Sequence, residues 1–210
     1  MNKKIELFQL IGNKILPYIA EIAKLRIQIF HEWPYLYEGC LEYEKKHLQT
    51  YTKTQESLVI IAKHGNRIIG AVTGVPAKDS MQEVQKALEN ASFPLETTYY
   101  LGEILLLDEY RGSGIGSQLY RFFEDSVRKK NRYHTVVLCE INRSDTDKRK
   151  PLSYEGLDVF WHHFQYKRSA KIKTSFSYQE IGSDKETPHP MVFWEKHLIP
   201  FIKNNTISTK

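Results

Sequence analysis

Residues 111–117 read Arg-Gly-Ser-Gly-Ile-Gly-Ser, and this stretch joins two segments of different character. Before it, residues 99–107 form a near-continuous apolar run of strand length, typical of a strand covered on both faces. After it, apolar residues recur at helical spacing from Ile115 onward. The closely spaced glycines allow unusual backbone angles and bring N–H donors against a ligand. The stretch therefore predicts a phosphate-binding turn at the positive end of a helix.

Two better known phosphate loops fit this turn poorly. The dinucleotide fingerprint G-x-G-x-x-G would place Ser117 at its third glycine, and it should open the first βαβ unit instead of lying in mid-chain. The P-loop pattern is absent, because no Lys-Ser or Lys-Thr pair follows a suitable glycine spacing. Nucleotide hydrolysis thereby loses its main support.

The turn resembles the R/Q-x-x-G-x-G/A signature of the GCN5-related N-acetyltransferases (GNAT), since Arg111 to Gly116 match all its fixed positions. The specific resemblance covers about residues 97–142. It implies a mixed α/β fold with a central, mostly antiparallel twisted sheet and helices on both faces. It also implies that strands 99–107 and 135–141 run parallel and splay apart around a coenzyme A (CoA) site. We expect one such domain over residues 1–205 and a tail at 206–210.

Hydrophobic periodicity and turn residues give the order of the remaining elements. The expected strands lie at residues 5–11, 57–63, 67–75, 99–107, 135–141, 170–178 and 191–194. The expected helices lie at residues 15–29, 41–51, 81–90, from 115 onward, and 157–166. Pro188 and Pro190 are expected to interrupt the chain before the last strand. This order agrees with the one that the resemblance implies.

The resemblance further implies that acetyl-CoA is the cosubstrate. Its pyrophosphate would lie in the glycine turn, and its pantetheine arm beside strand 99–107. The residues implied to contact it are Leu105, Leu106, Leu107, Arg111, Gly112, Ser113, Gly114, Ile115, Gly116, Ser117 and Asn142. For Asn142 a role as a turn-forming residue is the alternative.

Glu103 is the candidate general base, because a carboxylate within an apolar strand would resist ionisation and because many family members carry a Glu there. The alternative is a structural ion pair with a cation from a neighbouring element. The family's usual general acid is a Tyr at the position that Trp161 occupies here. Since an indole has no proton to donate at a useful pKa, Tyr154 is the candidate substitute.

The acceptor substrate is expected to meet the aromatic loop that contains Trp33, Tyr35 and Tyr37. A packed hydrophobic cap is the alternative for these rings. Glu140, near the end of strand 135–141, would line the same cleft and competes with Glu103 as base. The adjacent His162 and His163 would point about 100° apart on a helix, so we expect no metal cofactor.

The bulk properties permit such an enzyme. The 210 residues are 41% hydrophobic, and no stretch reaches the length of a membrane span, so we expect a cytoplasmic protein without a membrane partner. Two cysteines give no disulfide framework. The net charge of +5 suits an anionic cosubstrate. Because basic residues are spread among acidic ones, nucleic acid is disfavoured as a partner, while a homodimer is allowed.

The leading hypothesis is an N-acetyltransferase that moves an acetyl group from acetyl-CoA to a primary amine by direct attack. The acceptor would be a small molecule or a peptide, and the sequence does not identify it. A noncatalytic CoA-binding sensor or interaction module is the alternative, because Trp161 replaces the usual Tyr. Charge alone suggests a third class, a partner of nucleic acid.

Overall fold

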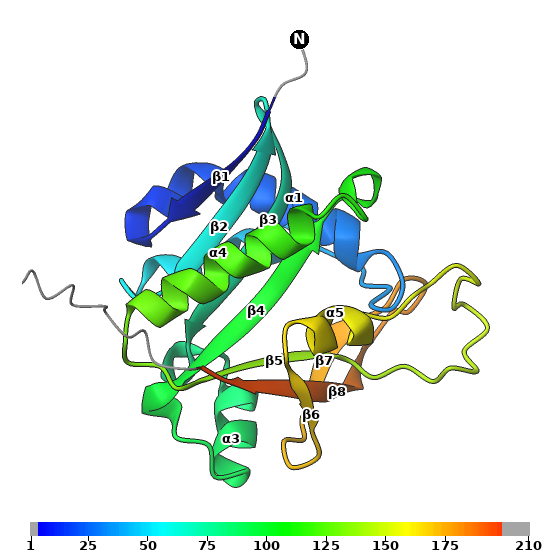
Figure 1. Cartoon of the computed structure of the whole chain (residues 1–210). Coiled ribbons are helices and arrows are strands. Elements are labelled where there is room, and N and C mark those ends of the chain that lie inside the picture. The colour runs from blue at the N-terminus through cyan, green and yellow to red at the C-terminus, as the bar shows by residue number, and fades with distance from the viewer. Residues whose placement is uncertain (1–3, 199–210) are drawn as a thin grey trace, which may run out of the picture.

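The computed structural model describes residues 4–198, so the expected tail at 206–210 and the end of the expected domain lie outside it. One sheet forms the centre of the molecule (Figure 1). Its strands are β1 (Ile5–Leu10), β2 (Leu58–His64), β3 (Arg67–Pro76), β4 (Thr98–Leu106), β5 (Thr135–Ile141), β6 (Lys167–Ser169), β7 (Ser175–Gln179) and β8 (Glu186–His197). They lie in the order β1-β2-β3-β4-β5-β8-β6, and β7 pairs with β8 off this path.

All the strand pairs are antiparallel except β4 with β5, as the resemblance implies. Two parallel neighbours need a crossover connection. Helix α4 (Ile115–Lys129) supplies it, because its buried face of Ile115, Leu119, Phe123 and Val127 packs on the sheet.

The helices lie on both faces of the sheet, with α4 in front and α1 behind (Figure 1). They are α1 (Ile19–Phe30), α2 (Leu41–Gln49), α3 (Gln82–Asn90), α4 and α5 (Asp158–His163). Helix α1 packs against β3, β4 and α2. A 3₁₀ segment at Gly12–Tyr18 contains Pro17 and takes the first turn of the helix expected from residue 15. The fold class predicted from the sequence is confirmed.

Two expectations near the C-terminal end are wrong. Of the strand expected at 170–178, only the second half forms a strand, β7, which begins at Ser175; residues 170–174 belong to no strand, and the short strand β6 ends before them at Ser169. The last strand begins at Glu186, so it includes Pro188 and Pro190 instead of following them. The Pro190 carbonyl accepts a hydrogen bond from the Asn142 amide, which means that the Pro190 nitrogen faces away from β7. A proline is tolerated there because no hydrogen bond to β7 is lost.

Candidate active site

The glycine turn precedes α4 and has the left-handed backbone that its sequence predicts. Gly112 has a φ of 71° and Gly114 a φ of 83°, angles that favour glycine. A Cβ atom built at either position meets nothing within 4 Å. Glycine is therefore required here by backbone conformation, and the space beside the turn is open to a ligand.

The backbone amides of residues 112–117 find no hydrogen-bond acceptor within residues 4–198. The first hydrogen bond of α4 runs from the Gln118 amide to the Gly114 carbonyl, at 3.1 Å. The free amides at the start of a helix, together with its dipole, favour an anion. The turn and the first residues of α4 therefore leave six amides available as donors to a ligand.

The side chain of Arg111 holds the turn against its surroundings. Its Nε atom donates to the Leu106 carbonyl at the end of β4, at 3.1 Å, and Nη2 lies 2.9 Å from a carboxylate oxygen of Glu32. The Ser113 hydroxyl donates to the Tyr110 carbonyl. These contacts fix the turn beside the end of β4, where Leu105, Leu106 and Leu107 lead into it.

Strands β4 and β5 separate just before this turn. Their parallel pairing runs from Thr98 with Thr135 to Leu101 with Leu138 and then stops. Beyond that point β4 pairs only with β3, and β5 pairs only with β8, within the described residues. The edge of β4 that faces β5 is therefore left without a strand partner over its last residues, and the two strands diverge in Figure 1.

A β-bulge at Gly102 marks the point of separation. Thr73 pairs with Glu103 and Gly74 pairs with Leu101, so Gly102 is the extra residue on β4. A Cβ atom at Gly102 would lie 2.5 Å from the Tyr51 hydroxyl and 3.0 Å from the Thr73 hydroxyl. Close approach of side chains, and not backbone angle, therefore requires glycine here.

A cavity of about 610 Å³ adjoins the separated strands. Its walls come from α1, α2, the loop before α2, β4, β5 and the β7–β8 hairpin. Of the residues predicted to act on the acceptor, Glu103, Tyr35 and Tyr37 line it. Trp33, Glu140 and Tyr154 do not. The geometry therefore brings the candidate base together with two rings of the aromatic loop.

Glu103 forms the ion pair that was the alternative to its catalytic role. Its Oε2 atom contacts the guanidinium of Arg26, and its Oε1 atom accepts a hydrogen bond of 3.2 Å from the Thr73 hydroxyl. Arg26 also donates to Glu44, so one buried guanidinium is shared by two buried carboxylates. Each carboxylate oxygen can accept a further proton donor. The ion pair is therefore compatible with a role in the cavity that Glu103 lines.

Glu140 is held by two indoles instead of facing the cavity. The Trp194 indole donates to Oε1 at 2.8 Å, and the Trp161 indole donates to Oε2 at 3.3 Å. Burial raises the pKa of Glu140, although these two hydrogen bonds act in the opposite direction. The two indole hydrogen bonds give Glu140 a structural role, because they join β5 to α5 and β8.

Tyr154 and Trp33 pack edge to face, with their ring centroids 6.2 Å apart. Burial raises the pKa of Tyr154, Glu140 and Asp158 raise it further, and Arg111 lowers it. Tyr154 thus lies under the electrostatic influence of both Glu140 on β5 and Arg111 in the glycine turn. The Asn142 amide donates to the Pro190 carbonyl at 2.8 Å, while its side chain is exposed.

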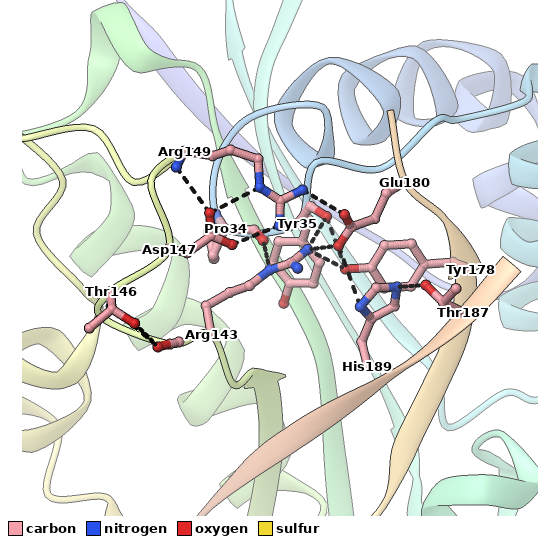
Figure 2. A network of polar contacts seen from close by, with 11 residues as sticks. Pro34, Tyr35, Arg143, Thr146, Asp147, Arg149, Tyr178, Glu180, Thr187 and His189 are labelled. Atoms are coloured by element: carbon pink, nitrogen blue, oxygen red, sulfur yellow. Dashed lines mark hydrogen bonds and ion pairs between the residues drawn. The ribbon is translucent and has the colours of Figure 1, made fainter. Parts of the chain in front are cut away.

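A polar network fixes the aromatic loop against the rest of the wall (Figure 2). The guanidinium of Arg143 donates to the carbonyls of Pro34 and Tyr35, at 2.7 and 2.9 Å. Arg143 and Arg149 both converge on the carboxylate of Glu180 in the β7–β8 turn. The aromatic loop, the segment that follows β5 and the β7–β8 turn are thereby joined beside the cavity.

Comparison with known proteins agrees with this geometry. A family model described as the acetyltransferase (GNAT) family matches residues 23–149, more than half of the chain. The chain belongs to this family. No curated protein matches its sequence. The family match places this chain among the GNAT acetyltransferases, and the fold agrees with that placement.

Solved GNAT structures share the fold at low sequence identity. NAA60 of Arabidopsis thaliana in complex with acetyl-CoA is 16% identical, with a TM-score of 0.59 over 93% of this chain and 99% of that one. The ribosomal-protein-alanine N-acetyltransferase of Brucella melitensis is 13% identical, with a TM-score of 0.55 over 92% and 99%. A GNAT acetyltransferase of Streptococcus pneumoniae is 12% identical, with a TM-score of 0.57 over 93% and 99%.

Several residues at the site of this GNAT chain were not predicted from the sequence: Arg26, Glu44, His47, Tyr51, Thr73 and the bulge residue Gly102. The sequence does contain a signal for a buried Arg26, because this residue lies four positions after Ile22 on the apolar face of α1. The others depend on pairing between distant elements, which no local pattern reports. Within residues 4–198, no helix has the length and apolarity needed to cross a membrane, and no cluster of His, Cys, Asp or Glu is placed to hold a metal.

Proposed function

We propose that the protein transfers an acetyl group from acetyl-CoA to a primary amine by direct attack. The observation that carries the proposal is the set of six free amides at residues 112–117, beside the gap where β4 leaves β5. A pyrophosphate is the anion that suits several N–H donors at a helix start. The NAA60 neighbour, which contains acetyl-CoA, supports this assignment.

The residues of the turn fit the cosubstrate. Gly112, Ser113, Gly114, Ile115, Gly116 and Ser117 would hold the pyrophosphate through their amides, and Arg111 would keep the turn in place. The pantetheine arm would lie along the free edge of β4 at Leu105, Leu106 and Leu107, with Asn142 at the end of β5. Acetyl-CoA would supply the thioester whose acetyl carbon the amine attacks. A backbone N–H of β4 would stabilise the developing oxyanion.

The proposed proton transfers use one residue on each side of the reaction. Glu103, in the cavity wall, takes the proton of the incoming ammonium directly or through a water molecule. The phenol of Tyr154 is protonated at neutral pH, as a tyrosine ordinarily is, and burial raises its pKa further, so Tyr154 has a proton to give to the departing thiolate. Tyr35 and Tyr37 contact the acceptor in the cavity, whereas Trp33 and Glu140 act by supporting the walls.

The proposal is tested by Gly114→Glu, measured by calorimetry with CoA and by thiol release from acetyl-CoA with a panel of amines. The substitution places a carboxylate at a φ of 83° in the anion site, so CoA binding should be lost. Gly182→Glu is the matched control, because Gly182 has a φ of 77° and equally open surroundings in the β7–β8 turn. Normal CoA binding by Gly114→Glu would refute the assignment of the turn.

A noncatalytic CoA-binding module is the second candidate. It is favoured by Trp161, which is buried and whose indole N–H is bound to Glu140, so that it gives no proton to a thiolate. The same panel separates the two candidates. Thiol release with any amine supports the transferase, while tight CoA binding without release from any amine supports the module. The cytoplasmic location and the homodimer stay predictions.

A further inference from the structure

The cavity is strongly acidic, although the whole chain is basic. Its lining includes six carboxylate residues, which are Glu38, Glu44, Asp79, Glu83, Glu103 and Glu186. Arg26 is the one permanent cation among the described lining residues. His47 also lines it, but burial and Arg26 lower the pKa of His47 to about 3, so the imidazole is neutral at physiological pH. A protein of net charge +5 therefore concentrates negative charge at this one hollow.

The floor of the cavity holds an incompletely satisfied carboxylate. Glu44 is 1% exposed and lines the cavity. Its Oε2 atom accepts from Arg26, but its Oε1 atom has no hydrogen-bond partner within residues 4–198. Burial and the nearby charge of Glu44 raise the pKa of the Tyr37 phenol, which places the Tyr37 hydroxyl beside this carboxylate. A buried acceptor without a donor is costly, so a donor from a ligand is expected here.

The rim of the cavity carries four carboxylates without an ion-pair partner among residues 4–198. Glu38, Asp79, Glu83 and Glu186 are exposed, and none of them forms an ion pair within the described part of the chain. They come from the loop before α2, from either side of the start of α3, and from β8. Charges of one sign around a cleft attract an oppositely charged ligand and raise its rate of association. Their distribution suits a ligand with more than one positive charge.

The cavity wall also carries many aromatic rings. The rings in the lining are Phe30, Tyr35, Tyr37, Tyr43, Tyr51, Tyr100, Phe176 and Tyr178. Aromatic faces attract ammonium groups and also pack against methylene chains. The presence of both rings and carboxylates in one cavity therefore matches a molecule in which aliphatic spacers separate amines. The volume of about 610 Å³ suits a small molecule of this kind.

From these features we infer that the acceptor is an aliphatic di- or polyamine whose distal ammonium binds Glu44 while a terminal amine reacts beside Glu103. The inference rests on the proposed transferase function. In the reaction the amine nitrogen forms a bond with the acetyl carbon, and the carbon–sulfur bond breaks. Glu103 or water takes the proton that leaves the nitrogen, and the thiolate takes a proton in turn. The second ammonium is unchanged and supplies binding energy only.

The test compares amines of matched length: an alkyl monoamine, a diamine and a linear triamine. Thiol release from acetyl-CoA should show a kcat/KM that rises about tenfold from the monoamine to the diamine, since one charge contact at short range can contribute that much. Rising salt concentration should reduce this advantage. Glu44→Gln should lower kcat/KM for the diamine about tenfold and leave the monoamine almost unchanged.

The matched control is Glu42→Gln on the same helix. The side chain of Glu42 is 80% exposed and pairs with Lys45, outside the cavity. It should leave the preference among the amines unchanged. If Glu44→Gln does not fold, the double variant Glu83→Gln with Glu186→Gln removes two exposed rim charges without disturbing the core. That variant should weaken triamine binding, measured by calorimetry, about threefold or more.

The outcomes separate the inference from the proposed function. A preference for the monoamine, or a diamine advantage that Glu44→Gln and the rim variant both leave intact, would overturn the polyamine assignment while acetyl transfer stands. Faster turnover of basic peptides or aminoglycosides than of the triamine would overturn it too. Binding of triamine by a protein that binds no CoA would support the cavity assignment and refute acetyl transfer.

Discussion

The substitution Gly102→Ala tests the bulge that separates the strands. The added methyl group would lie 2.5 Å from the Tyr51 hydroxyl and 3.0 Å from the Thr73 hydroxyl, both in buried surroundings. The backbone at Gly102 is not left-handed, so the whole effect is steric. Overpacking of this kind costs about 1–3 kcal/mol of unfolding free energy. For a chain of this size each kcal/mol lowers the Tm by roughly 2–4 °C.

The assay is denaturant and thermal unfolding of four proteins in a double-mutant cycle: wild type, Gly102→Ala, Tyr51→Phe and the double variant. Tyr51→Phe removes the hydroxyl that the methyl group would meet, together with its 3.0 Å hydrogen bond to Thr73. The loss of stability in the double variant should therefore be smaller than the sum of the two single losses, by about 1 kcal/mol.

Gly116→Ala serves as the stability control, because Gly116 lies within helix α4 and the nearest atoms to its Cβ, from Leu106 and Phe160, are 3.9 Å away. It should leave the Tm unchanged or slightly higher. Since Thr73 also contacts Glu103, Gly102→Ala should reduce turnover while CoA binding is kept. Additive losses in the cycle, or a Tm for Gly102→Ala equal to that of wild type, would refute the steric account.

Two further predictions concern titrating residues. Glu103→Gln should lower kcat and change the pH–rate profile without weakening CoA binding. If Glu140→Gln changes the pH–rate profile and Glu103→Gln does not, Glu140 is the base. His47 has a pKa of about 3 in the fold against 6.5 ordinarily, so its stabilising contribution is complete above pH 6.5 and is lost as the pH falls toward 3. His47→Gln should flatten the Tm profile over that range, and exposed His163→Gln should not.

Local signals in the sequence were sufficient to predict the glycine turn and the strand before it. The glycine turn could be predicted because left-handed angles at Gly112 and Gly114 require glycine whatever surrounds them. The run at 99–107 predicted β4 to within one residue at each end, because a strand buried on both faces is apolar throughout. Resemblance to the family then supplied the parallel pairing with β5, which no local pattern contains.

The acceptor side was harder to predict because its residues meet through tertiary contacts. Glu103 could be selected as a carboxylate in an apolar strand, but its partner Arg26 is on α1. Tyr35 and Tyr37 reach the cavity while Trp33, from the same loop, packs on Tyr154. The segment expected as a strand at 170–178 alternates in polarity as predicted, yet it forms a ladder with β8 only from Ser175 onward, and alternation alone does not report where that pairing begins.

The short ladder between β4 and β5 has a consequence for how this protein can diversify. Four residue pairs join the two parts of the sheet, and the glycine turn belongs entirely to the part that ends with β4 and α4. The family model stops at residue 149, whereas β7 and β8, which form one wall of the cavity, lie beyond it. Under the proposed function, mutations in that wall would change which amine is accepted while the turn keeps its sequence, so new specificities would evolve on an inherited cosubstrate site.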